Sequence, residues 1–470
     1  MNNELTKRMG TAPVLGLLLK MSLPMMVSML VTALYNIVDS YFVSMVSREA
    51  YDAVTLSFPM QMLVLAVGLG VSVGTNAIVS RRLGERNVAS ASELAQTGLF
   101  LSLVMSALFG VTGYGISYVY LLGFTKNNPE VFSLGMMYLP IVTSLSFGLM
   151  LELIGEKTLQ ATGNTKIPML SQLIGAIFNI ALDPLFIFVF DMGIAGAAVA
   201  TVLGQIFAMI FILVYIARHN PGIDMFFKSF KLHWSNIRAI INIGVPTFVM
   251  NAVTAFTTIT LNAILEGLHS ITAVTVLGSY FKLQSFVFMP VFGLSQGAFP
   301  IMNYNYGAHD KKRFVDTFKW MLIISVGIMV VGTVIFQVIP DKLMLIFHAE
   351  GELLTMGSVA LREISWCFIG AAFGISITNM FQALGHGMCS MLMSLLRQVV
   401  LLIPTVWIFG AFLGIDAAWY GYPFAEAITL VVFTPIAIIS LKRDFERAKR
   451  EDKDKTLALE SDSSSDNIEE

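Results

Sequence analysis

The chain has 470 residues, of which 56% are hydrophobic and only 13% are charged, and its formal net charge is −2. A typical soluble protein carries about 25% charged residues, so this composition excludes an ordinary soluble enzyme or binding domain. The small net charge identifies no partner, and we expect none among nucleic acids.

Long apolar blocks follow one another along the chain, each bounded by charged or turn residues. An apolar helix of about 20 residues crosses a bilayer, and these blocks lack the two-residue alternation of barrel strands. We therefore predict an all-α membrane protein with twelve transmembrane helices. In chain order the blocks are 13–45, 53–79, 93–121, 131–155, 167–190, 193–217, 237–265, 270–301, 314–339, 353–384, 389–413 and 417–441.

Basic residues are distributed unevenly over the loops between these blocks. Of the 29 Lys and Arg, 23 lie at the termini, in even-numbered loops or at the adjoining helix ends. The positive-inside rule then predicts that both termini are cytoplasmic, in a multi-pass protein of the plasma membrane. The start, MNNELTKRMG, does not have the layout of a cleaved signal peptide.

Two further features of the sequence concern covalent structure and order. Cys367 and Cys389 fall in different predicted spans, so we expect no disulfide. The C-terminal tail, 446–470, is acidic and rich in serine towards its end, and this composition predicts disorder.

The two halves of the chain repeat one another. Pro24 in the first block matches Pro246 in the seventh, and LQATG (159–163) matches FQALG (381–385), both at an offset of 222 residues. Gly70, Gly74 and Gly84 match Gly293, Gly297 and Gly307 at an offset of 223. Because each unit holds an even number of helices, the two units are parallel repeats with a pseudo-two-fold axis along the membrane normal.

The repeat predicts a division into two lobes around a central cleft. We expect an N-terminal six-helix lobe over 1–217, a basic cytoplasmic linker over 218–236 and a C-terminal six-helix lobe over 237–445. Rocking of one lobe against the other opens such a cleft to alternate sides of the membrane, which is typical of transporters.

Two acidic residues lie inside the N-terminal spans. Asp39 is nine residues before Arg48 and Asp183 is eight before Asp191, so both lie about 12–13 Å below the same membrane face at 1.5 Å per residue. Asn36 and Asn179 lie one turn from these acids, and Thr201 in the sixth block has a similar depth.

This layer of oxygen atoms suits a coupling ion. Carboxylate, amide and hydroxyl oxygens bind a hard cation such as Na⁺, so a sodium site at Asp39, Asn179, Asp183 and Thr201 is one prediction. The same two carboxyls can instead carry a proton, because close carboxylates resist ionising together. Pro184 removes a backbone hydrogen bond and predicts a kink beside the acids. The alternative is that each acid merely caps a helix or pairs with a structural partner.

The C-terminal half does not repeat this site, because Leu261 and Thr405 stand where the first half has Asp39 and Asp183. Its own buried charges include Lys282, Glu363 and Glu426. We expect a Lys282–Glu426 or Lys282–Glu363 ion pair, with either a structural role or a role in substrate binding or gating. Arg397 lies near the inner end of its span and can reach the surface.

The sequence contains no Walker motif, no spaced Cys/His metal set and no serine nucleophile elbow. We therefore expect that the protein is not an enzyme and binds no cofactor. We expect a Na⁺ or H⁺ gradient to supply the energy for transport. The expected partners are small cationic or amphiphilic molecules and the lipid bilayer, and we expect a functional monomer.

Several segments together resemble one transporter family. MSLPMMVSMLVTALYNIVDSYFVS, GLGVSVGTNAIVSRRLGE, FNIALDPLFIF, GIAGAAVATVLGQ and GLSQGAFPIMNYNYGA are similar to segments of the multidrug and toxic compound extrusion (MATE) family. The resemblance runs over about residues 13–441. It implies two six-helix bundles, a central cleft, and export of organic cations in exchange for Na⁺ or H⁺.

The resemblance also implies roles for single residues. Asp39 matches the family's coupling aspartate on the first helix, and Asn179, Asp183 and Thr201 match its fifth- and sixth-helix residues. Some members carry an acid on the seventh helix, where this chain reads MNAVTAFTT (250–258). The alternatives are a flippase for a lipid or lipid-linked precursor and, from another class, a receptor or membrane enzyme.

Overall fold

A computed structural model describes residues 2–125, 128–219, 222–226, 231–268, 271–347 and 349–466, the last sixteen by backbone alone. The described chain is helical. Eleven of its helices are long and apolar enough to span a membrane, or twelve when one bent pair is counted as a single span. The predicted all-α class and the predicted number of spans are therefore confirmed.

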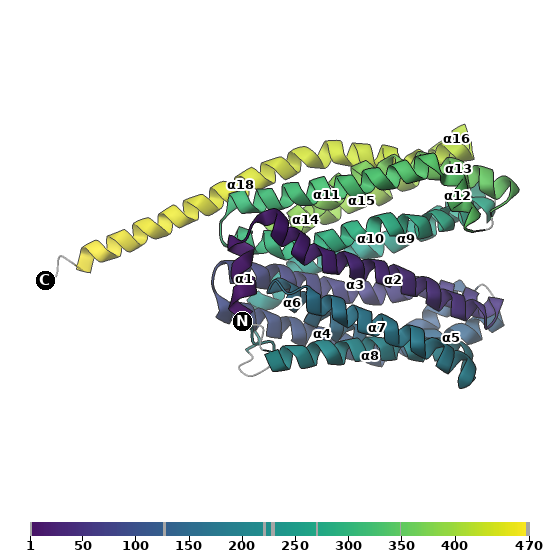
Figure 1. Ribbon diagram of the computed structural model, residues 1–470, viewed down its shortest axis with the longest axis horizontal. Coiled ribbons are helices and arrows are strands. Elements are labelled where there is room, and N and C mark those ends of the chain that lie inside the picture. Colours follow the sequence, from purple (N-terminus) through teal and green to yellow (C-terminus); the bar gives the residue numbers. More distant parts are fainter. Residues whose placement is uncertain are drawn as a thin grey trace.

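The first half forms one bundle, the N-lobe, in the lower part of Figure 1. A short helix, α1, lies across one end of it, and the spans run alternately away from that end and back. Its elements are α1 (Asn2–Thr11), α2 (Val14–Ser44), α3 (Arg48–Gly84), α4 (Val88–Phe124), α5 (Pro129–Ser144), α6 (Phe147–Ala161), α7 (Lys166–Pro184), the π-helix η1 (Leu185–Val189) and α8 (Gly193–His219).

The second half forms the C-lobe, in the upper part of Figure 1. Its elements are α9 (Trp234–Leu268), α10 (Ile271–Gly307), α11 (Lys311–Val338), α12 (Pro340–Leu345), α13 (Gly351–Ser365), α14 (Cys367–Leu384), α15 (Gly387–Leu395), the π-helix η2 (Leu396–Leu402), α16 (Ile403–Leu413), α17 (Ile415–Ala418) and α18 (Gly421–Asp466).

The fourth span is broken in both lobes. In the N-lobe, α5 and α6 meet at a bend of 41°. In the C-lobe, α13 ends at Ser365 and α14 begins at Cys367. The hydropathy pattern predicts each as one continuous block, because a break inside an apolar segment does not change its composition.

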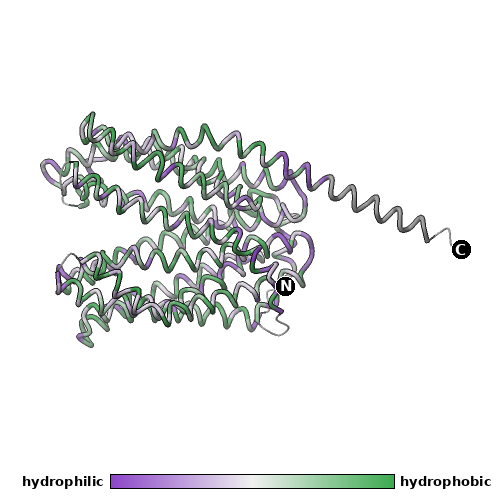
Figure 2. The backbone as a smooth tube through the Cα atoms, turned by 180° about the vertical axis from the view of Figure 1, so that it is seen from behind, coloured by the Kyte–Doolittle hydropathy of each residue, from purple (hydrophilic) through white to green (hydrophobic). Residues whose placement is uncertain are grey.

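The two lobes touch at the end of the molecule that holds α1 and the C-terminal part of α18, and their helices spread apart towards the other end (Figures 1 and 2). We call these the basal end and the distal end. Apolar residues cover the long middle of each helix, and polar residues gather at both ends, as a bilayer-spanning protein requires (Figure 2).

Glycines allow the close contact between the lobes. A Cβ added to Gly70 on α3 would lie 2.9 Å from the carbonyl oxygen of Gly244 on α9. At the repeat-equivalent position Gly293 on α10 packs against the backbone of Met26 on α2. Small residues let membrane helices approach to backbone contact, so the repeated glycines line the two faces where the lobes meet.

The repeat extends to the turns at the basal end. Arg86 and His309 both adopt left-handed backbone conformations, with φ of 60° and 55°, although neither is a glycine. The residue that directly follows each of them caps a helix: Asn87 accepts from the Ser90 N–H and Asp310 from the Arg313 N–H, both at 3.0 Å. These caps satisfy amide groups that a helix start otherwise leaves unpaired.

The C-terminal segment, 446–470, for which disorder stays a prediction, is described by its backbone up to Asp466. The structure continues α18 as one helix to Asp466, well beyond the last apolar residues of the span (Figure 1). Its sequence over 442–460 is rich in Lys, Arg, Glu, Ala and Leu, which favour helix once a preceding span has nucleated it. Residues 467–470 lie outside the described part of the chain.

Candidate functional site

The two acidic residues singled out in the N-lobe meet between α2 and α7. Asp39 lies five residues before the end of α2, and Asp183 lies six before the end of η1. Both are thus about 8–9 Å from the distal helix ends, at matched depth but nearer the end than expected. Asp183 is fully buried and Asp39 half-buried, and their carboxyl groups lie within hydrogen-bonding range of each other.

Polar side chains from three more helices surround this acid pair. Asn179 is buried one turn before Asp183, and its Nδ2 donates to the Thr201 hydroxyl on α8 at 3.4 Å. Tyr35 and Tyr138 lie within electrostatic reach of both acids, and the Tyr138 hydroxyl accepts from Gln61 at 3.4 Å. Asn36, by contrast, is exposed on α2 rather than buried beside Asp39.

The acid pair lacks a compensating cation among the described side chains. Both oxygens of Asp183 and Oδ1 of Asp39 are buried without a donor from an N–H or O–H group. Two carboxylates at this range cannot both stay ionised unless a proton or a cation lies between them. The oxygens present, with those of Asn179 and Thr201, fit either a shared proton or a small hard cation.

The local chain geometry follows from Pro184. The α-helix gives way directly after this proline to the π-helix η1, Leu185–Val189, so the distortion expected of it is present. Gly196 on α8 allows close approach, since a Cβ there would lie 2.7 Å from the carbonyl carbon of Phe186. The widened turn therefore packs directly against α8 beside the acid pair.

A second buried polar cluster, which sequence reasoning missed, lies in the basal half of the N-lobe. Glu152, Glu156 and Lys157 on α6 are 8%, 1% and 6% exposed. Oε2 of Glu156 accepts from Gln172 on α7 at 2.9 Å. The signal was present as three charges in LELIGEKTLQ, but counting charges by loop assigned Lys157 to a helix end.

The buried charges of the C-lobe pair differently from the expectation. Glu426 on α18 pairs with Arg397 on η2 at 3.5 Å, so Arg397 points to a buried acid rather than to the surface. Among the described ion pairs Lys282 joins neither Glu426 nor Glu363, and its ammonium group instead lies 5.9 Å from the centre of the Phe347 ring. The predicted Lys282 pairs are therefore wrong. Glu363 lies beside the Tyr420 hydroxyl.

The C-lobe pair occupies positions that are glycines in the N-lobe. Arg397 and Glu426 correspond, at an offset of 222 residues, to Gly175 and Gly204. A Cβ on Gly204 would lie 2.8 Å from the carbonyl oxygen of Gly175, so α7 and α8 touch where η2 and α18 are held apart by an ion pair. Both cysteines, Cys367 and Cys389, are free, as expected.

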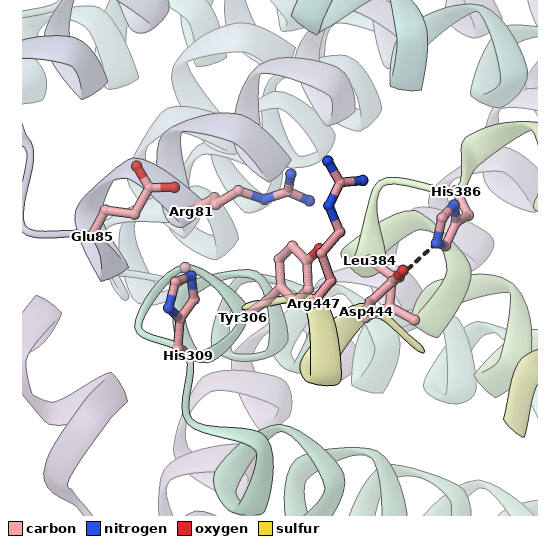
Figure 3. A pocket seen from close by; sticks show the side chains of 9 residues that line it. Arg81, Glu85, Tyr306, His309, Leu384, His386, Asp444 and Arg447 are labelled. Carbon is pink, nitrogen blue, oxygen red and sulfur yellow. Dashed lines mark hydrogen bonds and ion pairs between the residues drawn. The ribbon is translucent and has the colours of Figure 1, made fainter. Parts of the chain in front are cut away.

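A polar cavity of about 350 Å³ lies at the basal junction of the lobes (Figure 3). Arg81 of the N-lobe reaches into it, stacks 4.5 Å from the Tyr306 ring of the C-lobe and donates to the Ala383 carbonyl oxygen at 3.1 Å. Nε2 of His386 and Oδ2 of Asp444 are hydrogen-bonded at 2.6 Å on its C-lobe side, the dashed line in Figure 3. Arg81 thus fastens one lobe to the other.

Comparison with known families gives the same two-part division. The MatE family model matches this chain twice, over residues 24–185 and 246–408. The chain belongs to the MatE family. The two matches begin 222 residues apart, the offset of the internal repeat, so each lobe is one copy of the family's unit.

Relatives and solved structures agree with membership of the MatE family. The multidrug export protein MepA of Staphylococcus aureus (strain bovine RF122 / ET3-1) is 26% identical over 437 residues, 92% of this chain and 95% of its own. A MATE crystallised in complex with MaL6 superposes with a TM-score of 0.89 at 22% identity, over 93% of this chain and 99% of that one. A multidrug resistance MATE family transporter in an outward-facing conformation superposes with a TM-score of 0.89 at 22% identity, over 93% of this chain and 98% of that one. These likenesses confirm a transporter fold of two six-helix lobes.

Proposed function

We propose that this MatE-family protein is a secondary antiporter that exports organic cations or other amphiphilic molecules in exchange for inward-moving Na⁺ or H⁺. The observation that carries the proposal is the Asp39–Asp183 pair, buried between α2 and α7 without a donor from the described side chains. The similarity to MepA, which is named a multidrug export protein, supports the substrate class.

The excess of Lys and Arg at the basal end supports a cytoplasmic basal end and cytoplasmic termini. The distal end, where the lobes spread apart, then faces outwards in this conformation (Figure 1). A cation from outside reaches half-buried Asp39 first and neutralises the acid pair. Loss of that charge weakens the hold on a positively charged substrate, which then leaves on the distal side.

The ligand set around the pair supports either coupling ion. Asn179 and Thr201 add neutral oxygens to the two carboxyls, which suits Na⁺. The hydrogen-bonding range between Asp39 and Asp183 suits one shared proton equally well. In both cases this site acts through charge neutralisation, and the protein needs no cofactor, nucleic acid or second subunit for it.

The alternative, a lipid or lipid-linked precursor flippase, is less well supported. A phosphate headgroup needs free cations in the cleft. Arg397 is paired with Glu426, and Lys282 lies over an aromatic ring, so neither of these two cations stands ready for a phosphate. The names of the relatives also point to drugs rather than lipids.

The test is transport of a fluorescent organic cation in proteoliposomes, with Na⁺ and pH gradients imposed separately. Antiport predicts uptake against the substrate gradient with at least one of the two gradients and none without either. Transport that ignores both gradients, or movement of lipid alone, would overturn the proposal.

A further inference from the structure

The Glu152–Glu156–Lys157 cluster on α6 is not used by the site proposed above, yet it is buried in the same lobe. If all three groups were ionised the cluster would hold one uncompensated negative charge. Oε1 of Glu156 is buried and has no hydrogen-bond partner among the described residues. A buried carboxylate oxygen without a donor is costly, so Glu156 needs a proton or a cation to compensate its charge.

The obvious partner, Lys157, is engaged elsewhere. Its Nζ donates to Gln160 on the same helix at 3.0 Å and to Oε1 of Gln296 at 2.7 Å. Gln296 lies on α10, so this second bond crosses from the N-lobe to the C-lobe. The Gln296 amide also donates to the Met29 sulfur on α2 at 3.4 Å, which anchors it against the N-lobe twice.

The cluster is connected to the Asp39–Asp183 pair. Glu152 interacts electrostatically with Glu156 and also with Tyr35, and Tyr35 lies near both aspartates. On α7, Ser171 donates to Glu152 at 3.4 Å and Gln172 donates to Glu156. Ser28 on α2 donates in turn to Gln172. Among the described residues, the charged groups that interact with Glu156 are Glu152 and Lys157 on its own helix. Tyr35 on α2 interacts with Glu152 and links the cluster to Asp183 on α7, while α10 contributes neutral Gln296.

We propose that Glu156 is a second cation-carrying site and that Lys157 exchanges between Gln296 and Glu156 as the lobes part. With the lobes joined at the basal end, Gln296 holds Lys157, and Glu156 binds a proton or a sodium ion. When the basal contact opens, Gln296 withdraws and releases the ammonium group. Lys157 then turns to Glu156 and displaces the cation towards the basal side.

This exchange deepens the proposed antiport and rests on it, because it supplies a reason for cation release on one side only. By linkage, a ligand favours the conformation that binds it better. A cation on Glu156 therefore stabilises the basally closed state, and the Lys157–Glu156 pair stabilises the basally open one. Substitutions of Gln296 and of Glu156, the two groups between which Lys157 exchanges, should then shift the conformational equilibrium in opposite directions.

The equilibrium between the basally closed and basally open states can be measured by pulsed electron paramagnetic resonance, as the distance between spin labels at the distal ends of α4 and α11. Leu122→Cys and Val338→Cys provide exposed label positions, in a Cys389→Ala background. Gln296→Met keeps the side-chain length but removes the acceptor, and it should shift the population about tenfold towards the basally open state. Glu156→Gln removes the acid that receives Lys157, and it should shift the population the other way.

Two further variants keep the test decisive. Gln398→Met is the matched control, because Gln398 is a buried glutamine that bonds only within the C-lobe, to Ser394 at 2.8 Å. Gln296→Glu strengthens the bond to Lys157 and should favour the closed state, which covers the case that Gln296→Met fails to fold. Shifts of equal sign in Glu156→Gln and Gln296→Met, or shifts no larger than that of the control, would overturn the inference.

The ion that binds at Glu156 is identified in the double variant Asp39→Asn with Asp183→Asn, which lacks the first site. Titration with protons at fixed Na⁺, and with Na⁺ at fixed pH, should leave one cation-dependent shift that Glu156→Gln abolishes. If that shift persists without Glu156, the second site is refuted whatever the first site does. If Asp39→Asn alone exports normally, the proposed function fails while the second site can still stand.

Discussion

Gly84 and Gly307 stand at equivalent positions of the two repeats, and each packs against the backbone of the opposite lobe. A Cβ on Gly84 would collide with the carbonyl oxygen of Tyr304, and a Cβ on Gly307 with that of Arg81. The two contacts are related by the pseudo-two-fold axis and close the basal end from both sides. The contact depends on the absence of side chains, so it can be loosened by adding a single methyl group.

Gly84→Ala should therefore weaken basal closure. The overlap with a backbone oxygen costs about 1–3 kcal/mol in the closed state, which shifts the lobe equilibrium by about fivefold to about 150-fold. Spin-label distances at the distal ends should shorten, and gradient-driven export should fall. Gly115→Ala is the control, because a Cβ at Gly115 meets nothing within 4 Å. Equal behaviour of the two variants would show that the basal contact tolerates the methyl group.

Arg397→Met should destabilise the C-lobe. It leaves Glu426, whose side chain is 8% exposed, without its cation. Removing one partner of a buried pair costs about 3–5 kcal/mol, and the lower end applies because the Arg397 side chain is 29% exposed. The measurement is thermal unfolding in detergent. The double variant Arg397→Met with Glu426→Met should recover most of the loss, and a double variant no more stable than Arg397→Met would refute the pairing as the cause.

Thr201→Val separates the two candidate ions at the acid pair. The Thr201 hydroxyl lies 3.4 Å from Nδ2 of Asn179 and offers an oxygen to Na⁺, but a proton shared by two carboxyls does not need it. We expect the apparent affinity for Na⁺ to fall about tenfold, with proton-driven transport within about twofold of wild type. Initial rates over a Na⁺ series and a pH series measure both, and a loss confined to the proton-driven rate would contradict this assignment.

Lys282→Met tests whether Lys282, an exposed lysine of the C-lobe, has a specific role. Its contact with Phe347 is a cation–π interaction of 5.9 Å, worth about 0.5–1 kcal/mol at an exposed site. We expect unfolding temperature and export rate to stay close to wild type. Loss of export with unchanged stability would instead reveal a substrate-binding or gating role.

The fold was largely predictable because membrane spans are encoded by composition. The blocks 53–79 and 167–190 of the hydropathy pattern became α3 and α7 with η1, and the repeat offset reappeared in the two family matches. The bend between α5 and α6 was not predictable, since an apolar block looks the same whether it is straight or broken.

The candidate sites, like the fold, were predictable from the sequence only in part. Depth along a helix follows from residue counting, so the meeting of Asp39 and Asp183 could be anticipated. Side-chain direction around the helix and tilt do not follow from counting, and the Lys282 pairs failed for that reason. Lys157 was overlooked because the charge of a residue near a span's end looks like a loop charge until packing buries it.

Export by Asp39→Asn in proteoliposomes, compared with substrate binding by the same variant, tests most directly whether the acid pair couples transport to an ion gradient. The amide keeps the size of the side chain and removes the charge that pairs with Asp183. We expect that the variant folds and binds a fluorescent organic cation but no longer moves it against its gradient under either a Na⁺ or a pH gradient. Uphill export at the wild-type rate under the same gradients would contradict this expectation.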